Sequence, residues 1–190
     1  MDELCYQNMD ELIDSLDEQG KFTGKTILKS IAHSQGVFHP TVHIWIYTER
    51  GEILIQQRGK FKDTYPLLWD VSVAGHIGAG EDIYKAAIRE VKEEIGLNIT
   101  KEDLIKIGVF KSSQHHRKDL IDNEFHYTFL CNLKVPFSTL KKQDSEVEAL
   151  NMIPLIKFAE EVWGLANTVK YVPHSTEYYK TIIKSIKEQL

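Results

Sequence analysis

Three glutamates in one short stretch, Glu90, Glu93 and Glu94, are the residues of this chain best suited to chemistry. Residues 83–95 carry apolar side chains at helical spacing and stop at Gly96, which predicts a helix with the three carboxylates on one face. Such carboxylates repel one another by about 0.2–0.5 kcal/mol per pair. Mg²⁺ or Mn²⁺ removes this repulsion and keeps sites for a substrate phosphate. The pattern therefore predicts a metal site for phosphate chemistry; the alternative is a solvated acidic face.

A glycine-rich loop precedes this helix and contains Gly75, Gly78 and Gly80. Glycine lets the backbone approach a ligand or a metal closely, because it has no Cβ. Arg89 lies one helical turn before Glu93, a spacing at which the two side chains can pair. The loop and the helix together therefore form one candidate binding unit.

The same stretch, GHIGAGEDIYKAAIREVKEEIGL at residues 75–97, resembles the Nudix signature at every fixed position. The matching positions are Gly75, Glu81, Arg89-Glu90-Val91, Glu93-Glu94 and Gly96-Leu97. The resemblance implies an α/β/α sandwich, a loop–helix–loop that binds Mg²⁺ or Mn²⁺, and hydrolysis of a diphosphate linked to another group.

The resemblance also implies roles for individual residues. The implied metal ligands are Glu90 and Glu94, with Glu93 and the carbonyl of Gly75 as further ligands. Glu93 is alternatively the base that activates water, with Arg89 orienting it. Glu81 is expected to brace the loop.

The likeness extends over roughly residues 10–175, to a subgroup related to type I isopentenyl-diphosphate isomerase. It rests on HPTVHIW, QQR, the Trp69-Asp70 pair and Ala74-Gly75-His76. The isomerase needs a cysteine where this chain has Ala74, which cannot exchange a proton. The chain is also similar to the Nudix domain of plant proteins that carry a dipeptidyl-peptidase-like domain, through WDVSVAGHIGAGE, DNEF and YVP.

These likenesses favour hydrolysis of a small-molecule diphosphate, either a nucleoside diphosphate derivative or a prenyl diphosphate such as isopentenyl diphosphate. Two alternatives stay open: an isomerase-like protein, and a non-catalytic module that only binds a diphosphate.

Several residues outside the signature are further candidates. Glu124 aligns with a catalytic carboxylate of the isomerase and is expected to act as an extra ligand or base. Arg58 and Lys62 follow a strand and suit contact with a terminal phosphate.

His39 and His76 are expected near the substrate. Together with His33 they match isomerase positions that hold a second metal; packed polar histidines are the alternative. We expect Trp69 to pack beneath the site, and residues 115–118 to form an exposed loop without a role.

The whole chain, residues 1–190, is expected to form one α+β domain, a sandwich with a mixed, partly antiparallel sheet. It comprises an N-terminal strand and lead-in (1–35), the signature (75–97) and a C-terminal helix (174–190). Strands are expected at residues 12–17, 41–47, 53–57, 68–74, 104–111 and 124–133. Helices are expected at residues 83–95, 154–163 and 176–190.

Composition narrows the class of protein. The 190 residues are 42% hydrophobic and carry a net charge of −5, which is typical of a globular domain and argues against nucleic acid or anionic membrane as a partner. Cys5 and Cys131 have no partner at metal spacing, and the start of the chain lacks a signal-peptide pattern. We therefore expect a cytoplasmic enzyme with a small-molecule diphosphate as its partner, and we leave a homodimer open.

Overall fold

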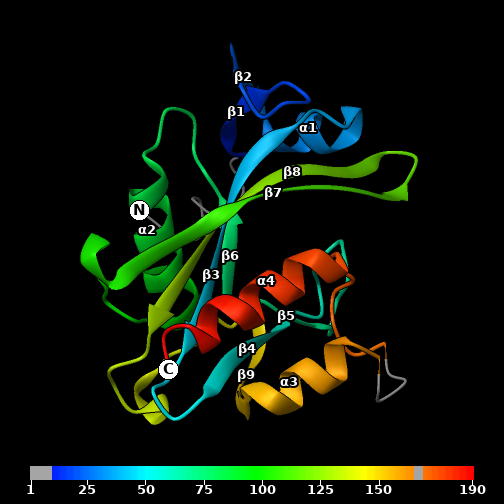
Figure 1. Ribbon diagram of the computed structural model, residues 1–190. Helices are drawn as coiled ribbons and strands as arrows, with labels where there is room; N and C mark the ends of the chain where they lie inside the picture. Colours follow the sequence, from blue (N-terminus) through cyan, green and yellow to red (C-terminus); the bar gives the residue numbers. More distant parts are fainter. Residues whose placement is uncertain (1–9, 165–168) are drawn as a thin grey trace.

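The computed structural model describes residues 10–164 and 169–190, so Cys5 and the first acidic residues lie outside the described part. A mixed sheet forms the centre of the molecule (Figure 1). Its path runs, in order, through β5 (Trp69–Asp70), β4 (Glu52–Arg58), β3 (His39–Tyr47), β8 (Leu120–Asn132) and β7 (Leu104–Arg117). Two further strands pair antiparallel with members of this path: β6 (Val73–His76) with β3, and β9 (Val147–Pro154) with β4.

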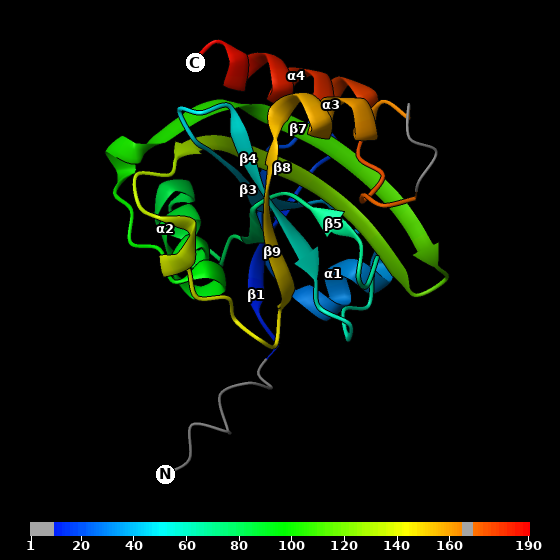
Figure 2. The ribbon, with the colours of Figure 1, turned by 90° about the horizontal axis from the view of Figure 1, so that it is seen from below.

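Strand β3 is buried along its whole length, because helices cover both faces of the sheet (Figures 1 and 2). Val42, Ile44 and Ile46 pack into the cluster that includes α2 (Ile83–Ile95). The opposite face carries Trp45. It packs with α3 (Leu155–Val162) and α4 (Thr176–Lys187). The expected α+β sandwich with a mixed sheet is confirmed.

Strand β3 changes its neighbour along its length. It pairs with β6 from Thr41 to Ile44, but with β4 only at the Tyr47–Ile53 register. Strand β4 pairs with β9 along its whole length and with β5 at Gln56 and Gln57. Residues of β6 and residues at the ends of β4 and β5 line one cleft.

The N-terminal segment adds an antiparallel pair and a short helix: β1 (Leu12–Leu16), β2 (Phe22–Leu28) and α1 (Lys29–Gln35). The sequence analysis predicted β1 but not β2, α1 or β9. The segment expected as a strand at residues 68–74 divides into β5 and β6, and α3 begins after Pro154, which closes β9.

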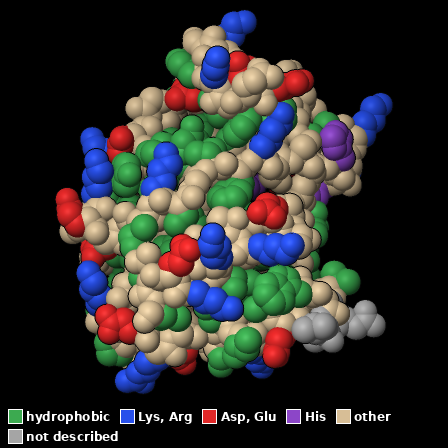
Figure 3. Space-filling view, viewed as in Figure 1, with side chains coloured by type: hydrophobic (Ala, Val, Ile, Leu, Met, Phe, Trp, Pro, Cys, Tyr) green, Lys and Arg blue, Asp and Glu red, His purple; other side chains and the backbone are tan. Residues whose placement is uncertain are grey.

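The prediction of an exposed loop at residues 115–118 is wrong in one respect: His115, Arg117 and Lys118 are exposed as expected, but residues 115–117 belong to a strand and not to a loop. Strand β7 continues through Arg117 because it stays paired with β8, and His116 Nε2 lies 2.9 Å from Asp122 Oδ2. Charged side chains of both signs and apolar side chains are interspersed over the face in Figure 3. Among the described helices, none has the length and apolar character that a membrane span requires.

Candidate active site

The cleft has a volume of about 590 Å³ and brings together residues that are distant in the sequence. Helix α2 contributes Arg89 and the three glutamates of the signature, and β6 contributes residues 74–76. Strands β3 and β8 add histidines and acids, and the segment after β4 adds Lys62 and Tyr65. The site therefore forms where elements distant in the sequence meet, and α1 and β5 also contribute His33 and Asp70.

Arg89 organises the carboxylates of α2. Its Nε and Nη2 atoms donate to the two oxygens of Glu81 at 3.0 and 2.9 Å. Its Nη1 atom donates to Glu90 at 2.6 Å and to Glu93 at 3.1 Å, the one-turn pairing that the spacing predicted. Nη2 also donates to the carbonyl of His76 at 3.0 Å. One guanidinium thus fixes the loop, the helix and strand β6 relative to one another.

Glu81 and Gly75 explain why the loop needs these residue types. Glu81 accepts a hydrogen bond from the backbone N–H of Gly78 at 3.0 Å. Burial alone would raise the pKa of Glu81, but the bond from Arg89 lowers it below its usual value. A Cβ at Gly75 would collide with the carboxylate of Glu90, so only glycine allows Glu90 to lie against β6.

Glu90 and Glu94 are acids whose charge is poorly compensated. Burial raises the pKa of Glu90 to about 7, against the influence of Arg89. Burial and the nearby Glu90 raise the pKa of Glu94 to about 8. Glu94 Oε2 is buried without a hydrogen-bond partner among the described residues. Glu93 is different, because 52% of its side chain is exposed.

A divalent cation fits this donor set on chemical grounds. Hard cations prefer carboxylate oxygens, and a positive charge between Glu90 and Glu94 would compensate both buried acids. The unpartnered Oε2 atom of Glu94 is a free ligand atom for such an ion. The donor set is therefore chemically compatible with the carboxylate metal site, which stays a prediction, because the described residues whose ligand atoms converge are those of the histidine cluster described next.

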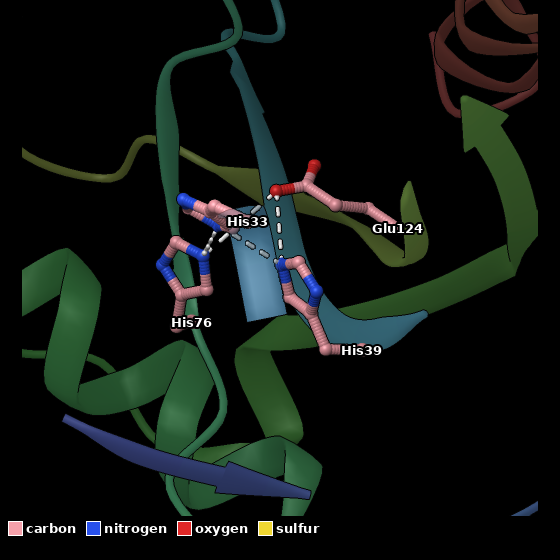
Figure 4. A group of neighbouring side chains, drawn as sticks. All are labelled: His33, His39, His76 and Glu124. Carbon is pink, nitrogen blue, oxygen red and sulfur yellow. Dashed lines mark hydrogen bonds and ion pairs between the residues drawn. The ribbon is translucent and has the colours of Figure 1, made fainter. Parts of the chain in front are cut away.

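In a second cluster His33, His39, His76 and Glu124 point toward one another (Figure 4), and all of them except the buried His39 line the same cleft. The Nε2 atom of His33 lies 3.3 Å from Nε2 of His39 and 3.3 Å from Nε2 of His76. Glu124 Oε1 lies 3.5 Å from His39 Nε2 and 3.8 Å from His76 Nε2. One ligand atom from each of the four residues lies within 4.8 Å of the others, so the group has the geometry to hold a metal ion.

The charges in this cluster depend on Glu124. Burial opposes its ionisation, but the bond with His39 and the nearby His126 hold its pKa well below the usual value. His39 Nδ1 contacts the carbonyl of Val37 at 2.9 Å, which leaves Nε2 facing the cluster. Burial keeps the pKa of His33 and His76 below the usual value, which favours the neutral imidazole, the form that ligates metals.

The two cations predicted to contact phosphate both line the cleft, but each already has an acidic partner. Arg58 Nη1 donates to Asp70 Oδ2 at 3.1 Å, and Lys62 pairs with Glu146. Trp69 packs against the apolar cluster around Trp45, next to the cleft residue Asp70.

Sequence reasoning missed three further histidines that line the cleft, His43, His126 and His174. It also missed Glu11, the residue immediately before β1. His43 and His126 alternate with apolar residues in predicted strands, a pattern that also describes ordinary packed histidines. His174 lies outside any motif, so no local signal distinguished it.

Comparisons with known proteins identify the family of this chain. A family model described as NUDIX domain matches residues 37–172. An uncharacterized Nudix hydrolase of Clostridium acetobutylicum is 30% identical over 205 residues, which cover 94% of this chain and 98% of that protein. Nudix hydrolase 3 of Arabidopsis thaliana is 34% identical over 149 residues, 76% of this chain but 19% of the plant protein.

An isopentenyl-diphosphate Delta-isomerase of Salmonella arizonae is 38% identical over 86 residues, which cover 45% of this chain and 47% of that enzyme. The fold is similar to the crystal structure of a Deinococcus radiodurans protein, with a TM-score of 0.68 and 18% identity over 90% of this chain and 98% of that one. The likenesses to Nudix hydrolases and to the isomerase are therefore confirmed. Because the family model matches residues 37–172 and the Clostridium acetobutylicum relative is similar over nearly its whole length, this chain belongs to the Nudix hydrolase family.

Proposed function

We propose that this protein hydrolyses a diphosphate linkage in a small molecule, with Mg²⁺ or Mn²⁺ held by Glu90 and Glu94 and with Glu93 as the base. The observation that carries the proposal is the pair of buried acids on α2, one of which has an unpartnered oxygen in the cleft. Nucleoside diphosphate derivatives and prenyl diphosphates are the two candidate substrate classes.

Exposure and charge suggest a different catalytic role for each of these residues. A bound divalent cation would neutralise the diphosphate and polarise the attacked phosphorus. Glu93 is exposed to the cleft and oriented by Arg89, so it is the group on α2 placed to accept a proton from the attacking water. The water oxygen then bonds to phosphorus while the bond to the bridging oxygen breaks. Lys62 lines the cleft and can exchange Glu146 for a substrate phosphate.

Phosphate release from a panel of diphosphates, with Mg²⁺, with Mn²⁺ and with EDTA, tests this proposal. We expect release only with a divalent cation, and a strong loss in the Glu93→Gln variant. Glu148→Gln is the matched control, because Glu148 is an exposed glutamate on β9. Undiminished turnover of Glu93→Gln, or equal turnover in EDTA, would contradict the proposal.

A second candidate function is isomerisation of isopentenyl diphosphate, and the cluster of His33, His39, His76 and Glu124 favours it. These positions match the isomerase metal site through the resemblance described above. However, Ala74 pairs across the strands with His43, at the place where the isomerase needs a cysteine. A methyl group cannot exchange a proton, so we propose that the cluster serves a hydrolase, as a second metal site.

Incubation with isopentenyl diphosphate separates the two functions. Formation of the dimethylallyl isomer would support isomerisation, whereas release of phosphate without that isomer would support hydrolysis. Tight metal-dependent binding without either product would instead indicate a non-catalytic module.

A further inference from the structure

His174 lines the cleft just before α4 begins, and the buried carboxylate of Asp70 holds its ring. Its Nε2 atom lies 2.8 Å from Asp70 Oδ1 on β5. The same carboxylate accepts from the N–H of Val71 at 2.8 Å and from Arg58 Nη1 at 3.1 Å. Both oxygens of Asp70 are therefore occupied, and the imidazole of His174 is anchored in one orientation.

Asp70 decides which nitrogen of His174 carries a hydrogen. Burial opposes the ionisation of Asp70, but the neighbouring His174 and Arg58 hold its pKa well below the usual value. A carboxylate can only accept hydrogen bonds, so Nε2 of His174 is the donor in this pair. Nδ1 is therefore the nitrogen at which His174 gains and loses a proton, while Nε2 keeps its hydrogen.

Nδ1 of His174 is accessible from the cleft. No residue in the described part of the chain hydrogen-bonds this nitrogen. The buried side-chain atoms without a partner in that part belong to Glu94, Asp122 and His126, so Nδ1 of His174 is not covered by protein. The ring borders both the cleft of about 590 Å³ and an adjoining cavity of about 240 Å³, and a substrate in the cleft can therefore contact Nδ1.

The other titratable groups packed against His174 favour their neutral forms. The ring of His43 on β3 lies 5.5 Å from that of His174, and the ring of His126 on β8 lies 6.0 Å away. Burial holds the pKa of His43 well below the usual value and lowers that of His126 to about 4. On α4, burial raises the pKa of Tyr178 and Tyr179 well above the usual value. The carboxylate on β5 is therefore the charged partner of this imidazole.

One strand pairing places the Asp70–His174 pair next to the carboxylates of α2. Asp70 lies opposite Gln56 of β4, and side chains opposite each other in an antiparallel pair share a face. Burial raises the pKa of Glu94 and the side chain of Gln56 acts against this rise, so Gln56 lies beside that carboxylate. Glu93 and His174 line the same cleft. A diphosphate bound at the carboxylates therefore has His174 on the neighbouring wall.

We propose that His174, oriented by Asp70, is the catalytic acid that protonates the leaving group of the hydrolysis. The inference rests on the proposed function, in which Glu93 takes a proton from the attacking water. As the water oxygen bonds to phosphorus, the bond from phosphorus to the bridging oxygen breaks and its electron pair stays on that oxygen. The bridging oxygen takes the proton from Nδ1 of His174, which keeps its Nε2 hydrogen bonded to Asp70. The cycle closes when Glu93 releases its proton to solvent and His174 takes one up.

The variant His174→Gln tests proton transfer separately from structure. Glutamine keeps a donor for Asp70 but has no group that titrates, so kcat should fall by about 10²–10⁴-fold while Tm stays close to that of the wild type. The matched control is His115→Gln, because His115 is an exposed histidine on β7, and it should keep wild-type kcat. The measurements use the diphosphate that the wild type turns over fastest.

Chemical rescue of His174→Ala distinguishes a proton donor from a packing residue. Imidazole can enter the space that this variant opens beside the cleft and should restore part of kcat. Pyrazole has a ring of the same size but is a far weaker base, so it should not restore activity. The same additions to His115→Gln control for binding of imidazole to the metal ion.

Two results would overturn the acid role while leaving hydrolysis intact: wild-type kcat in His174→Gln, or equal rescue of His174→Ala by imidazole and pyrazole. Absence of turnover by the wild type with every diphosphate would instead refute the proposed function, and the acid role with it.

Discussion

Glu94 is a buried acid without a matching charge, and its replacement by glutamine is expected to stabilise the metal-free protein. Burial and the nearby Glu90 raise its pKa from 4.5 to about 8. Between these values the folded protein keeps a proton that the unfolded chain has lost. The free energy of unfolding therefore falls as the pH rises from about 4.5 to about 8, and the penalty is absent below this window. Glutamine is neutral and nearly isosteric, so the variant escapes the penalty.

The magnitude follows from the size of the pKa shift. At about 1.4 kcal/mol per pKa unit, the full shift corresponds to an upper limit of about 5 kcal/mol. The part that develops between pH 6 and pH 8 amounts to about 2 kcal/mol. For a chain of this size, about 2–4 °C of Tm corresponds to each kcal/mol. The gain in Tm from Glu94→Gln should thus be larger at pH 8 than at pH 6 by about 4–8 °C.

Thermal unfolding followed by circular dichroism, in EDTA at pH 6, 7 and 8, measures this difference. Glu148→Gln serves as the matched control on the surface and should follow the wild-type profile. Added Mg²⁺ should raise the Tm of the wild type more at pH 8 than at pH 6, because the ion replaces the proton on Glu94. Parallel pH profiles for the wild type and Glu94→Gln would refute the reasoning.

Three further substitutions probe the site and its support. Glu93→Gln should lower metal-dependent phosphate release by about 10²–10⁴-fold without lowering Tm, and wild-type rates would exclude it as the base. Gly75→Ala should lower metal-dependent phosphate release, because its methyl group takes the place of the Glu90 carboxylate, the flexible end of that side chain; wild-type rates would contradict this clash. Tyr178→Phe should cost about 1–3 kcal/mol, because the buried Trp45 N–H loses its acceptor, and unaltered unfolding would show that water replaces it.

Helix α2 was predicted to the residue because the signals for both of its ends are local. The side chain of Asp82 accepts from the N–H groups of Tyr84 and Lys85, and Gly96 adopts a φ of 69° that favours glycine. The apolar residues at helical spacing between these two ends can be recognised in the sequence without knowing what the helix packs against. The prediction of the helix bounds is therefore confirmed.

Strands β2 and β9 were missed because their stability comes from pairing and not from their own pattern. Strand β2 is exposed at nearly every position, so it has no apolar alternation to detect. Strand β9 has an irregular burial pattern and is fixed by its pairing with β4. The C-terminal end of β7 was missed for the same reason, because its polar residues are held in an extended conformation by hydrogen bonding to β8.

The sequence by itself determined the carboxylate cluster of this Nudix protein, because residues spaced by three and four positions on a helix must share a face. Only the tertiary structure decided the histidine clusters. The parallel register of β3 on β8 sets His39 beside Glu124 and Thr41 beside His126, and β6 adds His76. Such proximity depends on strand pairing between distant segments, and no local spacing in the chain encodes it.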